Sequence, residues 1–361
     1  MTTQDFTPET PFLAVDLDLL ERNIARMAQV IIGEGRKNWR PHVKAMKTPA
    51  IAHKLLAAGA IGVTCAKLSE ADVMVAAGVR DILIANQVVG ASKLHRLANL
   101  NRHARVIAAV DGQKNLEEMD RVAASHDVTI PVVIEVDVGL QRAGVTPGDA
   151  VLALAQIIRA CGHVHFAGVM AWEGHAAAIA DPKQKEEAIH EAVGKLVKSA
   201  EMCAKAGIPV EIVSCGGTGT YPVTARIAGV TELEAGGGVF GDIRYRDEYA
   251  IPHECALTIW TSVISRPKPD RIVCDAGWKA MACFPTYPSP IGLGQISQIK
   301  LSAEHVKLDL VHAADRPEVG ERLQFVVGYS DSTVFLHDTL FAMRGDVVEL
   351  VWPLLARGKL Q

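Results

Sequence analysis

Between residues 39 and 240 the chain alternates short β-rich runs with longer runs rich in Ala and Leu. The β-rich runs carry Val and Ile without a regular polar alternation, which indicates strands buried on both faces and therefore parallel strands. Strands that alternate with helices form right-handed βαβ units, and eight such units predict a (β/α)8 TIM-type barrel. The eight predicted strands are residues 39–44, 61–66, 81–86, 105–111, 130–138, 166–172, 211–217 and 231–237.

After about residue 240 the pattern changes. Stretches such as "CALTIWTSVISRP" and "GQISQIKLSAEHVKLDLV" predict strands separated by Gly, Pro and Asp turns, which indicates an all-β second domain. The opening "PFLAVDLDLL" is expected to be a strand that joins this domain. We therefore predict a barrel over residues 17–240 and a β-domain formed by residues 1–16 plus 241–361.

Composition narrows the class of protein. At 361 residues, with 49% apolar and 22% charged residues, the chain is typical of a soluble globular protein of two domains. A net charge of −4 without a polybasic run argues against nucleic acid or an anionic membrane as the main partner. No stretch reaches about 18 uncharged apolar residues, and the first residues lack a basic region followed by an apolar one, so we expect neither a membrane span nor a secretory signal.

The seven cysteines are odd in number and scattered, without a CxxC pair. This pattern predicts reduced thiols in a cytoplasmic protein, mostly as small buried side chains, and not a disulfide frame or a structural zinc site.

Glycine-rich and polar segments follow the predicted strands at the end of the barrel where active sites usually lie. The loops after strands seven and eight of such barrels often hold a phosphate, and here they are "SCGGTGT" at 214–220 and "EAGGGVF" at 234–240. Glycine lets backbone N–H groups approach a phosphate, and Thr218 or Thr220 adds a hydroxyl donor. Tight turning would explain either cluster alone, but the two together favour a phosphate site. The other polar side chains at the strand ends are Lys44, Asp137, Arg142, Trp172, Glu173 and His175.

Lys44 ends the first predicted strand in "WRPHVKAMKTP" and is expected to point into the mouth of the barrel. Desolvation and nearby cations such as Arg40 would lower the pKa of its amine, and a deprotonated amine forms an imine with an aldehyde. A phosphate site opposite an imine-forming lysine is the arrangement that pyridoxal phosphate requires. Lys47 lies beyond the strand, where we expect a solvated loop lysine, so Lys44 is the predicted cofactor lysine.

Motifs spread over the whole chain resemble one family of enzymes. "RPHVKAMK" matches the form R-P-H-x-K-x-H-K except at Met46. Further matches are "TCAKLSEA", "DILIANQVVG", "EVDVGLQRAGV", "SCGGTGT", "TELEAGGGVF", "CDAGWKA" and "VELVWPLLARGK". Together they resemble the fold type III pyridoxal phosphate enzymes, the alanine racemase-like group, in the branch of D-threonine aldolase and D-serine dehydratase. The resemblance implies a homodimer in which the β-domain of each subunit completes the active site of the other.

The resemblance also implies roles for individual residues. Lys44 takes the position of the Schiff-base lysine, and Arg142 that of an arginine that contacts the phenolic oxygen of the cofactor. Trp172 stands where the family usually has a tyrosine near the cofactor ring. The implied phosphate cradle consists of Thr218, Gly219, Gly236, Gly237 and Gly238.

The departures from the family pattern concern the metal and the base. Aldolases of this branch bind a divalent metal such as Mn or Mg through an H-x-D pair, and the dehydratases use H-x-C. In "GYSDSTVFLHD" Asp331 matches the aldolase ligand, but Tyr329 replaces the histidine with a poorer ligand, so the implied metal is weak, held differently or absent. Met46 removes a second histidine of the motif. His175 is then the candidate base, although a surface or packing histidine is an equally good interpretation.

The resemblance implies a pyridoxal phosphate-dependent lyase that cleaves D-3-hydroxy amino acids to glycine and an aldehyde. Three alternatives stay open. A dehydratase acting on D-serine or D-3-hydroxyaspartate is disfavoured because Asp331 matches the aldolases, whereas an amino-acid racemase or epimerase would need no metal. The third alternative is not an enzyme but a non-catalytic carrier of pyridoxal phosphate. Such a carrier would not need a β-domain.

Overall fold

The computed structural model describes residues 7–313 and 316–361, which form two compact units. We call one the barrel unit; it consists of residues 25–44, 49–236 and 359–361. We call the other the β unit; it consists of the described residues up to Ile24 together with residues 45–48 and 237–358.

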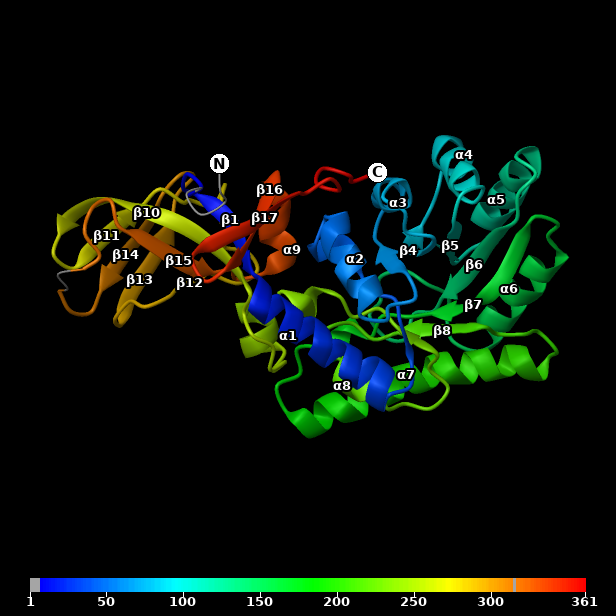
Figure 1. Ribbon diagram of the computed structural model, residues 1–361. Coiled ribbons are helices and arrows are strands. Elements are labelled where there is room, and N and C mark those ends of the chain that lie inside the picture. Colours follow the sequence, from blue (N-terminus) through cyan, green and yellow to red (C-terminus); the bar gives the residue numbers. More distant parts are fainter. Residues whose placement is uncertain (1–6, 314–315) are drawn as a thin grey trace. The chain divides into compact units, whose positions relative to one another are not determined.

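Eight parallel strands form the barrel unit, as the sequence predicts (Figure 1). Their order is β2-β9-β8-β7-β6-β5-β4-β3. A parallel bridge between His42 and Thr64 joins the chain after β2 to β3. A backbone hydrogen bond of 2.9 Å from Ile61 N–H to the Trp39 carbonyl lies beside it, so the two edges of the sheet meet and the barrel is closed. The strands are β2 (Asn38–Trp39), β3 (Val63–Cys65), β4 (Asp81–Gln87), β5 (Arg105–Val110), β6 (Ile130–Glu135), β7 (Val164–Met170), β8 (Ile212–Cys215) and β9 (Glu232–Leu233).

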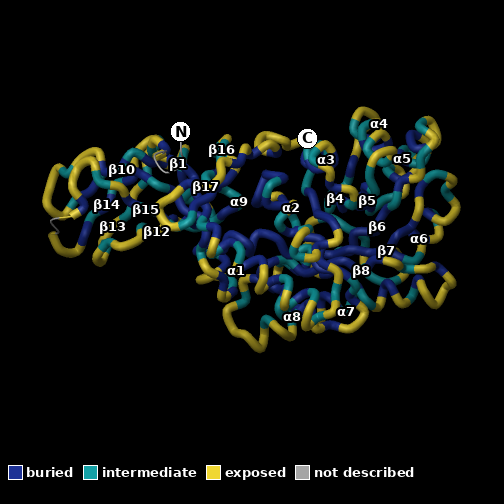
Figure 2. The backbone as a smooth tube through the Cα atoms, in the orientation of Figure 1, coloured by how far each residue is buried: buried dark blue, intermediate teal, exposed yellow. Residues whose placement is uncertain are grey.

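Helices cover the outer face of this sheet. In Figure 2 the strands β5 to β8 are mostly buried, while the helices over them carry exposed residues. The sequence sets the start of the longest helix, because the Asp181 side chain accepts the N–H of Gln184 at 2.8 Å and Pro182 occupies the first turn. The helices of the barrel unit are α2 (Pro49–Ala57), α3 (Leu68–Ala76), α4 (Ala91–Leu100), α5 (Gln113–Ser125), α6 (Asp149–Ala160), α7 (Pro182–Lys205) and α8 (Tyr221–Thr224), and α1 (Leu17–Ala28) contains a boundary between the units.

A nine-stranded sheet forms the β unit. The opening strand, β1 (Phe12–Asp16), pairs antiparallel with β10 and parallel with β16, so the prediction that it joins this domain is confirmed. A short helix, α9 (Ser330–Thr333), interrupts the C-terminal strands. The sequence-based boundaries, 17–240 and 1–16 plus 241–361, stay a prediction. The other strands are β10 (Leu257–Lys268), β11 (Arg271–Cys274), β12 (Ser289–Pro290), β13 (Ile296–Leu301), β14 (Val306–Leu310), β15 (Arg322–Val326), β16 (Thr339–Arg344) and β17 (Val347–Pro353).

Two simpler expectations concern membranes and cysteines. Among the helices that the structure describes, none combines the length and the apolar character that crossing a membrane requires. All seven cysteines are free thiols, as predicted. Four of them are buried, and Cys161, Cys255 and Cys283 are half-buried.

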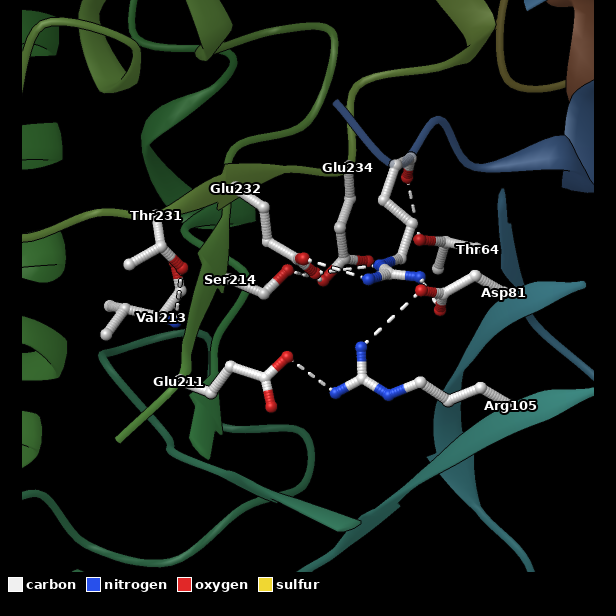
Figure 3. A network of polar contacts seen from close by, with 10 residues as sticks. Thr64, Asp81, Arg105, Glu211, Val213, Ser214, Thr231, Glu232 and Glu234 are labelled. Atoms are coloured by element: carbon white, nitrogen blue, oxygen red, sulfur yellow. Dashed lines mark hydrogen bonds and ion pairs between the residues drawn. The ribbon is translucent and has the colours of Figure 1, made fainter. Parts of the chain in front are cut away.

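Polar residues from several strands, among them Asp81, Glu232 and Glu234, form a network of contacts in the barrel unit (Figure 3). Arg40 is 1% exposed, and its Nε and Nη2 donate to the carboxylate of Glu232 at 3.0 and 3.1 Å, while Nη1 pairs with Asp81. Asp81 and Glu232 are the first residues of β4 and β9, so this network lies at the amino ends of the strands. Two carboxylates therefore compensate the charge of Arg40 at the end of the barrel away from the predicted site, and its suggested effect on Lys44 stays a prediction.

An apolar layer and a further carboxyl group fill the rest of the interior. Residues two apart on a strand share a face, so Glu234 faces inward like Glu232. The hydroxyl of Ser214 donates to Glu234 at 2.9 Å. Burial, together with repulsion from Glu232 and Glu135, raises the pKa of Glu234 from 4.5 to about 8. The apolar layer consists of Leu83, Ile107, Ala109, Val133, Ala167, Met170 and Ile212.

We predict that Glu234→Gln removes part of the pH dependence of stability. Because the pKa of Glu234 is raised on folding, the folded protein binds more protons than the unfolded chain between pH 4.5 and about 8, and stability falls as the pH rises through this window. An amide keeps the acceptor for Ser214 and carries no charge. The free energy of unfolding can be measured by urea unfolding followed by circular dichroism. Between about pH 5 and about pH 9 we expect it to fall by about 2–4 kcal/mol more in wild type than in the variant.

The matched control is Glu211→Gln, since Glu211 is an exposed carboxylate paired with Arg105 and should change this difference little. Parallel pH profiles for wild type and Glu234→Gln would contradict a buried, protonated Glu234.

Candidate active site

Lys44 lies on a 3-10 turn, Val43–Ala45, that follows β2. The sequence predicted a strand up to Lys44, but β2 ends at Trp39 and the chain turns after His42. The Lys44 N–H lies 3.3 Å from His42 Nδ1, and both of its neighbours in the turn are 1% exposed. The side chain of Lys44 itself is exposed. A buried turn thus presents this amine beyond the carboxyl end of β2.

Lys47 is buried, so the prediction of a solvated loop lysine is wrong. Its backbone has a left-handed φ of 55°, and its carbonyl oxygen accepts the N–H of Ala356 at 2.9 Å. Helix α2 begins two residues later at Pro49. The chain changes direction between the 3-10 turn and this helix, and hydrophobic periodicity does not reveal a left-handed residue that makes such a turn possible.

One buried carboxylate holds the glycine turn after β8. Glu173 is fully buried, and its Oε1 accepts the hydroxyls of Thr220 and Thr224 at 2.6 and 2.8 Å. Its Oε2 accepts the N–H of Gly216 at 3.3 Å. The hydroxyl proton of Thr220 is committed to Glu173, so Thr218 stays the predicted hydroxyl donor to a phosphate.

Trp172 lies against the same turn. A Cβ added to Gly217 would come within 2.3 Å of the indole carbons Cη2 and Cζ3, and one added to Gly174 would come within 2.3 Å of the indole Nε1. Glycine at position 217 is therefore what lets the indole pack onto the turn. Thr218 and Gly219 are buried in it.

The second glycine cluster is also closely packed. A Cβ on Gly236 would lie 2.1 Å from the carbonyl oxygen of His42, and a Cβ on Gly237 would lie 2.5 Å from the hydroxyl of Tyr245. The carbonyl oxygen of Gly238 lies 2.6 Å from Nδ1 of His253. The neighbouring backbone therefore requires glycine at position 236, and the packed side chain of Tyr245 favours glycine at position 237.

Arg142 belongs to a polar group that sequence reasoning found only in part. Its Nη2 lies 3.5 Å from Oε1 of Glu135, a buried carboxylate that ends β6. Gln87, which ends β4, donates to the other oxygen of Glu135 at 2.5 Å. The sequence analysis missed Glu135 and Gln87. Both lie at the ends of barrel strands, and a position near a strand end is the signal that indicated Arg142.

His175 lies on the 3-10 turn Gly174–Ala176 with an exposed side chain. A Cβ on Gly139 would come 3.0 Å from its Cε1, so the ring lies over the loop after β6. Asp137 shapes that loop, because it accepts the N–H groups of Gln141 and Gly139 at 3.0 Å, and these bonds lower the pKa of its carboxyl. The role of His175 as a base stays a prediction.

The pair predicted to hold a metal lies at the start of α9 in the β unit, where Tyr329 precedes the helix and Asp331 belongs to its first turn. The phenol O–H of Tyr329 donates to Asp331 Oδ2 at 3.0 Å. Burial, followed by the charge of Asp331, raises the pKa of the Tyr329 phenol well above its ordinary value. The guanidinium of Arg244 stacks on the Tyr329 ring. A protonated phenol is a poor ligand and a guanidinium repels cations, so these residues do not fit a divalent metal.

The barrel residues fit pyridoxal phosphate better. Lys44, Arg142 and the turn 216–220 all follow the carboxyl ends of strands of the same closed barrel. They supply an amine, a cation and a glycine turn braced by a buried carboxylate, which are the groups that an aldehyde, a phenolic oxygen and a phosphate require.

Two family models match the chain. "Alanine racemase, N-terminal domain" covers residues 15–244, and "Putative serine dehydratase domain" covers residues 256–343.

Individual relatives cover almost the whole chain. A D-threonine aldolase of Arthrobacter sp. is 36% identical over 97% of this chain and 93% of its own length. A 3-hydroxy-D-aspartate aldolase of Paracoccus denitrificans is 34% identical over 97% of this chain and 92% of its own. The crystal structure of D-threonine aldolase from Filomicrobium marinum superposes with a TM-score of 0.94 at 32% identity, over 98% of this chain and 97% of that one.

A dehydratase is similar as well. D-threo-3-hydroxyaspartate dehydratase from Delftia sp. superposes with a TM-score of 0.84 at 27% identity, over 97% of this chain and 98% of that one, and a mutant of such a dehydratase is known in a metal-free form. This chain therefore belongs to the alanine racemase-like family, in the branch that contains D-threonine aldolases and the serine dehydratase-like enzymes.

Proposed function

We propose that this chain is a pyridoxal phosphate-dependent lyase that cleaves D-3-hydroxy amino acids to glycine and an aldehyde. One observation carries the proposal: the chain aligns with a D-threonine aldolase over 97% of its length, and an exposed lysine of the shared motif follows the first strand of a closed barrel. A lysine in that place can hold a cofactor aldehyde.

Each group of the site has a proposed part in binding the cofactor. Lys44 would bind the aldehyde, and Arg142 would contact the phenolic oxygen. The turn 216–220, with the Thr218 hydroxyl and Gly219, would hold the phosphate together with Gly236–Gly238. Trp172 would lie beside the ring. When bound, pyridoxal phosphate withdraws electrons from the Cα atom of an amino acid.

The chain must then move two protons. A base accepts the proton of the substrate β-hydroxyl, the Cα–Cβ bond breaks, and the carbon–oxygen bond becomes the carbonyl of the aldehyde. The electron pair left on Cα takes up a proton to give glycine. His175 is our candidate for the base. On the family resemblance we also expect a cytoplasmic homodimer in which the β-domain of each subunit contributes to the site of the other.

Elimination is the second candidate. The similarity of residues 256–343 to a putative serine dehydratase domain, and of the fold to D-threo-3-hydroxyaspartate dehydratase, supports loss of water from the same substrates to give a ketoacid and ammonia. Asp331 matches the aldolase pattern and supports cleavage of the carbon–carbon bond.

We predict that the purified protein is yellow and that Lys44→Ala abolishes both its visible band and its turnover. D-threonine, D-serine and D-3-hydroxyaspartate should be offered and the products identified by mass spectrometry. We expect glycine with an aldehyde, and a loss of at least ~10³-fold in kcat for Lys44→Ala. The control is Lys183→Ala, which removes an exposed lysine of α7.

A ketoacid with ammonia would identify a dehydratase, and the mirror-image amino acid a racemase. A protein that binds pyridoxal phosphate but converts none of these compounds would support the carrier. A colourless protein that gains no band with added pyridoxal phosphate would contradict every version of the proposal.

We further predict that Glu173→Gln weakens binding of pyridoxal phosphate and spares binding of pyridoxal. An amide offers one acceptor oxygen to the three donors of the turn and turns an N–H group toward another donor, so the turn loses its fixed shape. We expect the Kd of pyridoxal phosphate, measured by absorbance, to rise about 10- to 100-fold, and that of pyridoxal, which lacks the phosphate, to change less than about twofold.

Glu191→Gln, an exposed glutamate paired with Lys195, is the matched control. An equal loss of affinity for both compounds would show that Glu173 supports the barrel in general and not the phosphate turn.

A further inference from the structure

The Tyr329–Asp331 pair is held in a fixed position within the β unit. Asp242 is fully buried, and its Oδ2 accepts both the N–H and the hydroxyl of Ser330 at 2.8 and 2.9 Å. Its Oδ1 accepts the N–H of Tyr245 at 2.9 Å. The residue between the two members of the pair is therefore anchored from its buried side, so their side chains start from a defined backbone.

One hydrogen bond joins the two members of the pair. The Tyr329 hydroxyl donates its one proton to Asp331 Oδ2 at 3.0 Å, and in doing so uses one of the carboxylate oxygens that a metal would need. An imidazole at position 329 could offer a nitrogen lone pair to a cation, whereas a phenol that keeps its proton offers only a weak acceptor.

A positive charge already lies beside the pair. The Cζ atom of Arg244 lies 5.0 Å from the ring centroid of Tyr329 and 5.3 Å from that of Tyr249. Its backbone N–H donates to the carbonyl of Gly328 at 3.0 Å, and its Nε lies 3.3 Å from a carboxylate oxygen of Glu248. Two aromatic rings and the carboxylate of Glu248 thus lie around the guanidinium, and the backbone hydrogen bond fixes the segment that carries it.

The described residues offer no alternative set of ligands. Across 7–313 and 316–361, no group of three or more His, Cys, Asp or Glu side chains is placed to hold a metal ion. A divalent cation bound to Asp331 would thus lack a set of three such side chains in the described part of the chain, and the guanidinium would repel it.

We propose that this chain works without a divalent metal at the Tyr329–Asp331 position, and that the Arg244 guanidinium supplies the fixed positive charge there. The second part rests on the proposed lyase function and on the family resemblance, which implies that a β-domain completes the active site; a positive charge contributed there would favour loss of the proton of the substrate hydroxyl. The first part concerns binding alone and can be tested whether or not a substrate is known.

The binding test uses the holoenzyme after exhaustive dialysis against a chelator. The metal content of the protein is measured by elemental mass spectrometry, and Mn²⁺ binding is measured from the EPR signal of free Mn²⁺. We expect wild type to hold less than ~0.1 Mn²⁺ per chain at micromolar metal, whereas the double variant Tyr329→His/Arg244→Gln, which adds an imidazole and removes the cation, should bind at least about tenfold more tightly.

The activity test distinguishes an effect of the Arg244 charge on turnover from an effect of the substitution on folding. Arg244→Gln should lower kcat at least about tenfold with little change in KM, and Arg244→Lys, which keeps the charge, should recover part of the loss. The matched control is Arg246→Gln, two residues away on the same segment, where the guanidinium pairs with Asp247 and is exposed. Circular dichroism and the visible cofactor band show that each variant is folded and loaded.

Stoichiometric Mn²⁺ on the dialysed wild type, or turnover abolished by the chelator and restored by Mn²⁺, would overturn the metal-free site. Equal kcat for wild type and Arg244→Gln would overturn the role of the guanidinium. If no substrate is converted, the proposed function fails while the binding experiment still decides the metal question, so the two failures are distinguishable.

Discussion

Closure of eight parallel strands is the constraint on which the rest of the site depends. The bridge between His42 and Thr64 joins the edges of the sheet, and it places the carboxyl ends of all eight strands around one rim. Lys44 and the turn 216–220 are far apart in the sequence, yet both follow strands of this rim. If the sheet were open between β2 and β3, the turn that carries Lys44 would lose the bridge that joins it to β3.

Charge is distributed unevenly along the interior of the barrel. At the amino ends of the strands, Arg40 is matched by Glu232 and Asp81, which avoids the cost of roughly 3–5 kcal/mol that follows when one partner of a buried ion pair is lost. Toward the carboxyl ends, Glu234 is held by a serine hydroxyl, and burial favours its neutral form. Glu173 accepts hydrogen bonds from Gly216 and Thr220 and so fixes the glycine turn. The fully buried ion pair of Arg40 and Glu232 thus lies at one end of the barrel, and the polar groups predicted to bind the cofactor lie at the other.

The sequence predicts the fold well because the governing signals are local. Unbroken runs of Val and Ile identify strands buried on both faces, and the strand ends then indicate Lys44, Arg142 and the glycine clusters as candidates for the site. The opening strand of the β unit was found in the same way and is confirmed by its pairing with β10.

The features that the sequence analysis misjudged or missed depend on the contact partners of individual side chains. A local sequence pattern does not reveal these partners. Arg40 lies next to Lys44's segment in sequence, but its side chain reaches strands β4 and β9 at the other end of the barrel. Lys47 is polar, and only its left-handed backbone and buried position reveal a structural role. Glu173 has an ordinary loop sequence around it, and its importance comes from three donors that follow β8. The stacking of Arg244 on Tyr329 likewise joins segments that are distant in the chain.

The most direct test of the central claim is to locate the cofactor on the chain. Reduction of the holoenzyme with borohydride fixes pyridoxal phosphate to the amine that holds it, and peptide mapping by mass spectrometry then identifies the residue. We predict one modified lysine per chain, at Lys44. Modification at the buried Lys47, at a lysine outside the barrel rim, or at no residue would contradict the account.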